Sequence, residues 1–307
     1  MNKTNNDQSS MKKKLYLLAA LAFVGIAAHA TVLRVNNVDA SAPYKNVNDA
    51  VKAAAEGDTI RVDGTSVDYD AATLNKRLVL IGPGYWLREN GIDTESAHAA
   101  TINEVNVQAE GCVVMGMNIT AQVVINGAKT IVTRCRVAGN ISMESNINNC
   151  VIHQNMLGGN VGSGYGHSYY HQITNNIFGN ISCQGVSESY IAYNTSFAHW
   201  GESFWNSYNC KIEKNQFNDE AYVKGDKDNT YSDNYWVGDG YQDIQTDKDV
   251  RDSLLPQEAY DYGAFAGNDP YVISGIPAGP MIEELTIPTS VEEGGTMEVT
   301  LKLGANK

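Results

Sequence analysis

The sequence predicts an all-β protein, a right-handed parallel β-helix in which short strands wind as a solenoid with about 20 residues per coil. Three observations support this fold. An apolar-x-x-Asn-x-apolar signature sets the register of seven consecutive units that are 18 to 21 residues apart, of which the last five carry the Asn. A Gly-Asn pair recurs at 139–140, 159–160 and 179–180. The repeated region is also rich in Val, Ile and Asn and poor in helix-forming residues.

The first element, residues 1–30, is predicted to be a signal peptide with an N-terminal extension. Lysines at 12–14 precede the apolar run LYLLAALAFVGIAA, and the small residues of AHA at 28–30 suit cleavage after Ala30. The ten residues before Met11 form the upstream extension. We therefore expect an exported protein, located in the periplasm, outside the cell or on its surface.

The second element is the β-helix domain, residues 31–277, for which we expect nine or ten coils. It opens with VNDAVKAAAEGDTIRV, residues 47–62, which predicts an amphipathic helix followed by a strand. Asn48 is the expected N-cap, and Gly57 lies near the expected helix end. Such a helix would cover the open end of the first coil, where unpaired strand edges would otherwise face water.

Within the coils, the repeated asparagines are interpreted as corner residues. A tight corner needs a residue that tolerates positive φ, and an Asn amide can hydrogen-bond to the next Asn along the stack. Residues one winding apart should therefore become neighbours. The predicted structural ladder consists of Asn155, Asn176, Asn194, Asn215 and Asn234.

The third element, residues 278–307, predicts two strands around Glu-Glu-Gly-Gly. Because so short a segment cannot bury a core of its own, the hairpin needs a partner. Two interpretations remain open. The hairpin packs against the last coil as a cap, which we favour, or it is an element that docks on another protein by strand addition.

Two segments resemble a known family. AVKAAAEGDTIRV and LNKRLVLIGPGY, within 50–85, look like the opening of the pectin-lyase-like β-helix superfamily. DYGAFAGNDPYVISGIP, residues 261–277, is similar to the closing segment of bacterial exported β-helix proteins. The resemblance implies the β-helix fold, but the superfamily includes lyases, hydrolases and adhesins, so it does not decide the activity.

Charge narrows the choice of partners. The chain has a net charge of −13. Removal of the positively charged leader would leave a value near −16, and a strongly negative surface disfavours nucleic acid, anionic membranes and polyanionic glycans. No second apolar segment is long enough to span a bilayer, so no membrane insertion is expected.

Carboxylates are scarce where catalysis would need them. Uronate lyases hold calcium with clustered acids, and glycoside hydrolases use two carboxyl groups. The only acidic residues within 121–200 are Glu144 and Glu188. The repeat units are also of nearly equal length, which leaves no room for long loops. An active site, if one exists, should lie near an end of the stack, in 85–100 or 237–261. A polysaccharide lyase or glycoside hydrolase of this kind is the alternative to a non-enzyme.

Aromatic residues give a different indication. Exposed rings can stack on the apolar faces of sugars. We therefore predict a protein that binds carbohydrate or another surface ligand on a lateral face without cleaving it. A structural surface protein or adhesin subunit is a further alternative. The predicted ligand-binding residues, which fall on adjacent turns, are Tyr165, Tyr169, Tyr170, His199, Trp200, Trp205 and Tyr208.

No cofactor is expected except calcium, which prefers dense oxygen ligands. The candidate ligands are Asp219, Asp226, Asp228 and Asp233. Alternation along the strands places His153 outward and His171 inward. The inward column of His171 also contains Cys112, Cys150 and Cys210, which we expect to be free buried thiols.

Overall fold

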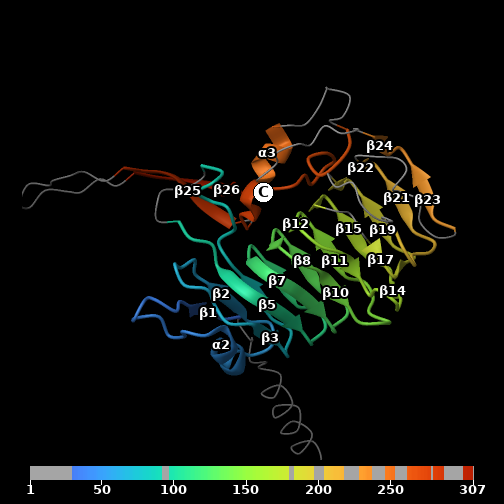
Figure 1. Cartoon of the computed structure of the whole chain (residues 1–307). Helices are drawn as coiled ribbons and strands as arrows, with labels where there is room; N and C mark the ends of the chain where they lie inside the picture. Colours follow the sequence, from blue (N-terminus) through green and yellow to red (C-terminus); the bar gives the residue numbers. More distant parts are fainter. Residues whose placement is uncertain are drawn as a thin grey trace, which may run out of the picture.

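The computed structural model describes residues 30–91, 97–179, 183–196, 204–217, 228–236, 246–252, 261–277, 279–286 and 300–306, the last two ranges by their backbone. Its windings lie side by side along one axis, from the first winding in blue to the last in orange (Figure 1). The fold is a right-handed parallel β-helix, as predicted.

One face of the solenoid is a ten-stranded parallel sheet to which each winding contributes one strand. The register is aligned, so Ile152 pairs with Ile173 and Ile173 with Ile191. In order, the strands are β1 (Val32–Val35), β2 (Thr59–Val62), β4 (Val79–Ile81), β6 (Val113–Met115), β8 (Ile131–Thr133), β11 (Val151–His153), β15 (Gln172–Thr174), β19 (Tyr190–Ala192), β21 (Lys211–Glu213) and β23 (Thr230–Ser232).

A twelve-stranded sheet forms the rest of the wall. Its β7 pairs with β9 through 118–119 and with β10 through 123–125, so the sheet divides into two faces. A further pair, β14 (Ser168–Tyr169) and β18 (Val186–Ser187), lies just before the ten-stranded sheet in two windings. The twelve strands are β3 (Ala72–Leu74), β5 (Thr101–Val107), β7 (Asn118–Ile125), β9 (Arg136–Val137), β10 (Ile141–Met143), β12 (Met156–Leu157), β13 (Val161–Gly162), β16 (Ile177–Phe178), β17 (Cys183–Gln184), β20 (Thr195–Ser196), β22 (Gln216–Phe217) and β24 (Tyr235–Trp236).

The interior is filled by stacked aliphatic side chains, mostly Val and Ile, that alternate with outward residues along most of the longer strands. All five cysteines are buried and free, which confirms the prediction for Cys112, Cys150 and Cys210. The structure therefore depends on packing and hydrogen bonds, with no disulfide between these residues.

The asparagine ladder is present. The Oδ1 atom of Asn176 accepts hydrogen bonds from the backbone N–H and the Nδ2 of Asn155, at 2.9 and 3.0 Å. The same pattern joins Asn176 to Asn194, Asn194 to Asn215, and Asn215 to Asn234. These amides lie in the corner between the two large sheets, so residues one winding apart are neighbours as predicted.

The reason that we gave for the asparagines was partly wrong. None of the five has positive φ; that conformation belongs to the residue before each one, for example Gln154 (φ 56°) before Asn155. The ladder position is instead selected because its buried amide must satisfy backbone groups of the adjoining winding. The positive-φ corner residues, one per winding, are Gly116, Arg134, Gln154, Asn175, Tyr193, Lys214 and Asp233.

The N-terminal helix is confirmed in place, but its limits differ. Helix α2 (Val47–Ala53) contacts β1, β2 and β3 and buries Val47, Ala50 and Val51. Its N-cap is Asn46, whose side chain accepts a hydrogen bond from the backbone N–H of Asn48. Asn48, the expected cap, instead bonds to the next winding through Ala71 and Thr73.

After the last winding the chain turns back. Residues 261–277, here called the strap, run along the corner between the two large sheets in the direction opposite to the winding order. The strap contains the 3₁₀ turn η3 (Ile273–Gly275), which contacts helix α3 (Asp247–Asp252). It begins at Gly263, bonded to Lys214, and ends at Pro277, which lies against Gly116.

The C-terminal hairpin is formed by β25 (Gly279–Thr286) and β26 (Thr300–Asn306), which pair antiparallel to each other. The chain enters this hairpin from Pro277, which lies against Gly116 in the winding of β6. Neither described helix has the length and apolar content that a membrane crossing requires.

Candidate ligand-binding surface

Six rings gather where the β14–β18 pair meets the turn before it. Tyr165 and Trp205 form an edge-to-face pair with ring centroids 5.2 Å apart. Tyr165 is the most exposed large hydrophobic residue of the described chain, at 92%. This group is called the aromatic cluster; its members are Tyr165, His167, Tyr169, Tyr170, Trp205 and Tyr208.

The cluster spans three windings: Tyr165 to Tyr170 precede β15, Trp205 and Tyr208 precede β21, and the winding of β19 lies between them. The His167 ring lies 5.3 Å from that of Tyr208 and 6.3 Å from that of Tyr169. Tyr169 lies 6.2 Å from Tyr170. Hydrogen bonding by Glu188 to the Tyr170 hydroxyl, together with the negative charge of Glu188, raises the pKa of this tyrosine. The rings are therefore held in fixed mutual positions before any ligand arrives.

Backbone geometry fixes the turns that present these rings. Gly185 has φ 64°, and a Cβ there would lie 2.1 Å from the carbonyl O of Gly166, so only glycine fits. Its N–H donates to the carbonyl of Trp205 at 3.0 Å. The Nδ2 of Asn206 lies 3.3 to 3.4 Å from the carbonyls of 164–166. The two turns that carry Tyr165 and Trp205 are thereby joined.

A polar groove of about 280 Å³ is lined on one side by Ser163 and Gly164, the two residues before Tyr165. On its floor Ser142, Gly162 and Gln184 are register partners on three neighbouring strands. Gly162 has φ 129°, and a Cβ there would lie 2.1 Å from the carbonyl O of Gln184, so this position requires glycine. The polar side chains of this groove are Asn140, Ser142, Glu144, Ser145, Asn160, Ser163 and Gln184.

A second hollow, the strap cleft, lies on the ten-stranded sheet and has a volume of about 410 Å³. Residues 267–269 of the strap form one wall. The floor and the other side are formed by Val151, His153, Gln172, Thr174, Tyr190 and Tyr193, with Asn175 below the strap.

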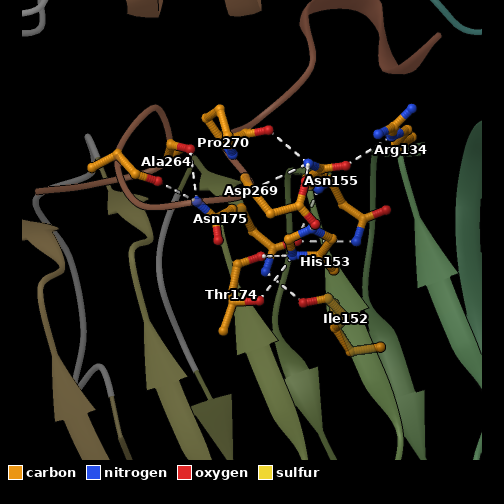
Figure 2. A network of polar contacts seen from close by, with 12 residues as sticks. Arg134, Ile152, His153, Asn155, Thr174, Asn175, Ala264, Asp269 and Pro270 are labelled. Atoms are coloured by element: carbon orange, nitrogen blue, oxygen red, sulfur yellow. Dashed lines mark hydrogen bonds and ion pairs between the residues drawn. The ribbon is translucent and has the colours of Figure 1, made fainter. Parts of the chain in front are cut away.

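Polar contacts hold the wall of the strap cleft in place (Figure 2). The Nε2 of His153 lies 3.0 Å from Oδ2 of Asp269, and its Nδ1 lies 2.8 Å from Oγ1 of Thr174. The buried amide of Asn175 donates to the carbonyls of Ala264 and Ala266. These contacts confirm that His153 points outward, and they give it a partner that is 116 residues away in the sequence.

His171 points inward, as predicted, and is almost fully buried. Its Nδ1 accepts the backbone N–H of Cys150 at 3.1 Å, while Nε2 has no hydrogen-bond partner. Burial lowers the pKa of His171 to about 4. The ring is therefore neutral at physiological pH.

Five of the seven predicted aromatic ligands are thus brought together, whereas His199 and Trp200 lie outside the described residues. Of the predicted calcium ligands, Asp219 and Asp226 also lie outside them. Asp228 and Asp233 are described, and Asp233 pairs with Lys214 at 3.5 Å. Among the residues that the structure describes, no three His, Cys, Asp or Glu side chains could hold a metal ion.

Sequence reasoning missed the polar groove and the strap cleft. The groove is lined by short polar residues and glycines of three neighbouring windings, which carry no distinctive signal in the sequence. The cleft depends on the strap, whose contacts join residues far apart in the sequence. Comparison with family models, curated proteins and solved structures finds no match to this chain.

Proposed function

We propose that this protein is an exported, non-catalytic β-helix protein that binds an uncharged polysaccharide through the aromatic cluster and the polar groove. One observation carries the proposal. The exposed ring of Tyr165 packs edge-on against Trp205, and Gly164, the residue before Tyr165, lines a groove that carries hydroxyl, amide and carboxylate groups.

This combination matches the chemistry of a sugar. A pyranose ring has an apolar face that stacks on an aromatic ring and hydroxyls that need hydrogen-bond partners. Gln184 and Asn160 can serve a hydroxyl as donor or acceptor, whereas Glu144 accepts only. Rings that already contact each other lose little conformational entropy when the ligand binds.

Charge favours an uncharged glycan over an acidic one. Among the described residues that line the groove there is one carboxylate, Glu144, and no Lys or Arg. A uronate or sulfate placed here would meet like charge without a cation to offset it. The net charge of −13 acts in the same direction.

We propose binding without cleavage because hydrolysis of a glycosidic bond requires two carboxyl groups across that bond. The groove lining supplies Glu144 alone. Glu188, the other acidic residue within 121–200, is hydrogen-bonded to the hydroxyl of Tyr170. Binding on a rigid face suits attachment to, or capture of, a glycan at the cell surface.

The experiment is affinity electrophoresis and calorimetry with mannan, xylan, mixed-linkage glucan and polygalacturonate. The mature protein should bind at least one neutral polymer and not polygalacturonate. Tyr165→Ala should weaken that binding about tenfold, equivalent to about 1.4 kcal/mol, because the stacking surface is lost. Val67→Ala, at an exposed residue of an early winding, is the matched control and should bind normally.

Two outcomes would contradict the proposal. One is the absence of binding to every neutral polymer, and the other is binding that survives Tyr165→Ala combined with Trp205→Ala. New reducing ends, or an unsaturated product that absorbs in the ultraviolet, would show instead that the protein is an enzyme.

A further inference from the structure

We propose that the binding surface does not end at the aromatic cluster but continues around the winding into the strap cleft, so that one polysaccharide chain several sugars long lies across both. This inference rests on the proposed function and extends it from a single stacking site to an extended track. The track runs along the winding direction, across the axis of the solenoid.

The path is a single stretch of chain. Tyr165 belongs to the turn before β14, Tyr169 to β14, and Thr174 to the end of β15. The stretch contains a turn at Tyr165 and a corner at Tyr170. It passes from Gly164, which lines the polar groove, to Gln172 and Thr174, which line the strap cleft.

Tyr170 links the two parts. Its φ of 60° places it at the corner between β14 and β15, and its side chain is 53% exposed. Glu188 bonds to its hydroxyl and so orients the ring. Two residues later, Gln172 lies in the strap cleft beside its register partner Tyr190. Aromatic and amide side chains therefore follow one another along the chain from the cluster to the cleft.

The strap cleft repeats the chemistry of the first site. Tyr190 and Tyr193 offer rings, while Gln172 and Asn268 offer exposed amides. Burial and Glu213 together raise the pKa of Tyr190 to about 12, so its hydroxyl stays protonated and donates to Glu213 at 2.9 Å. Among the described lining residues, Asp269 is acidic and none is Lys or Arg.

Lys211, a cation next to the strap cleft, does not change the preference of the cleft for an uncharged ligand. Lys211 is the register partner of Tyr190 on the adjacent strand, and its Nζ lies 2.7 Å from Oε1 of Glu213. Its charge is therefore already offset. Both ends of the track select an uncharged hydroxyl-rich ligand, which is what a single polysaccharide chain would present along its length.

The cleft exists before ligand binding because the strap is bonded in place. The buried amide of Gln154 donates to Asp269 and Pro270, and His153 lies against the same Asp269 carboxylate (Figure 2). Little ordering is then needed when a glycan enters, so the second site should add directly to affinity.

The test is calorimetry with oligosaccharides from disaccharide to octasaccharide, prepared from mannan, xylan and mixed-linkage glucan. Affinity should rise with length until both sites are occupied and then level off. Gln172→Ala combined with Asn268→Ala should lower octasaccharide affinity about tenfold and leave disaccharide affinity unchanged. Gln108→Ala, another exposed glutamine, is the control.

The outcomes separate this inference from the proposed function. Glycan binding that needs Tyr165 but does not depend on chain length, or on Gln172 and Asn268, overturns the track and leaves the first site intact. Absence of binding to all three neutral polymers overturns both. A circular dichroism melt identical to wild type shows that each variant is folded.

Discussion

The amide of Gln154 joins two parts of the chain that are more than a hundred residues apart. Its Nε2 lies 2.6 Å from the carbonyl O of Pro270 and 2.9 Å from Oδ1 of Asp269, while its Oε1 accepts from Nε of Arg134 at 2.7 Å. Gln154 is 1% exposed and has φ 56°. A corner residue of the solenoid is thus also the main anchor of the strap.

Shortening this anchor should therefore weaken the fold. Gln154→Asn retains a residue that accepts positive φ but cannot reach Pro270, so buried polar groups lose their partner. We expect a loss of about 2 kcal/mol in the free energy of unfolding, measured by urea titration. Gln172→Asn, at an exposed position, should change it by less than about 0.5 kcal/mol. Equal effects of the two variants would contradict the anchoring role.

The asparagine ladder predicts a difference between its middle and its end. Asn176→Ala removes an amide that bonds to Asn155, Asn194 and the carbonyl of Ile152, all of them buried. We expect a loss of about 3 kcal/mol. Asn234→Ala, at the half-buried end of the ladder, should cost about 1 kcal/mol because water can replace its bonds. Chemical denaturation of both variants measures the contrast.

His171 should make the protein acid-sensitive. Its folded-state pKa of about 4 lies below the ordinary value of 6.5, so the unfolded chain binds the proton more readily. Stability is therefore lost as pH falls from about 6.5 to about 4, by an amount on the order of 3 kcal/mol. His171→Asn keeps an acceptor for Cys150 and should flatten this part of the stability–pH curve. His167→Asn should leave it unchanged, and a wild-type slope in His171→Asn would refute the assignment.

The cysteines should be inert in the folded protein. Burial raises the pKa of Cys135 to about 12 and that of Cys150 and Cys210 to about 11, and it also raises the pKa of Cys112 and Cys183. A thiol reagent at neutral pH should label none of them in native buffer and all five in concentrated urea. Native labelling, or a mass deficit of two hydrogens, would be the contrary result.

The turn behind the aromatic cluster should not tolerate a methyl group. Gly185→Ala would place Cβ against the carbonyl of Gly166, in addition to the strain of φ 64°. Gly91 has φ 66° with open space around its Cβ position, so Gly91→Ala isolates the strain alone, about 1 kcal/mol. Gly185→Ala should lower the melting temperature further than Gly91→Ala and also weaken glycan binding.

The fold was predictable because a twenty-residue period leaves few architectures other than a solenoid of strands. Pattern alone locates a corner to within about one residue, which is why positive φ was assigned to Asn155 when it belongs to Gln154. The N-cap of α2 shows the same uncertainty, because Asn46 and Asn48 are chemically equivalent in the sequence. Only the structure shows that Asn48 is needed to bond the next winding.

The site was predictable in part. The expectation that these aromatic residues fall on adjacent turns was wrong for Tyr165 and Trp205, because the winding of β19 lies between theirs. Their rings nevertheless come into contact across that winding. The strap cleft could not be predicted, since its wall comes from 267–269 and its floor from residues about a hundred positions earlier. No periodicity connects these two segments, and Gln154 is an ordinary polar residue until Pro270 is placed above it.

The strap also changes how the molecule should come apart. In a bare solenoid each repeat interacts only with its nearest neighbours, so repeats can fray in succession from either end. Here one segment is bonded to Lys214, Asn175, Gln154 and Arg134 in turn. Successive repeats are thereby coupled through one bonded segment, so the windings that the strap contacts should unfold in one sharp cooperative step. Folding of these windings, in turn, cannot be completed until the strap has been synthesised.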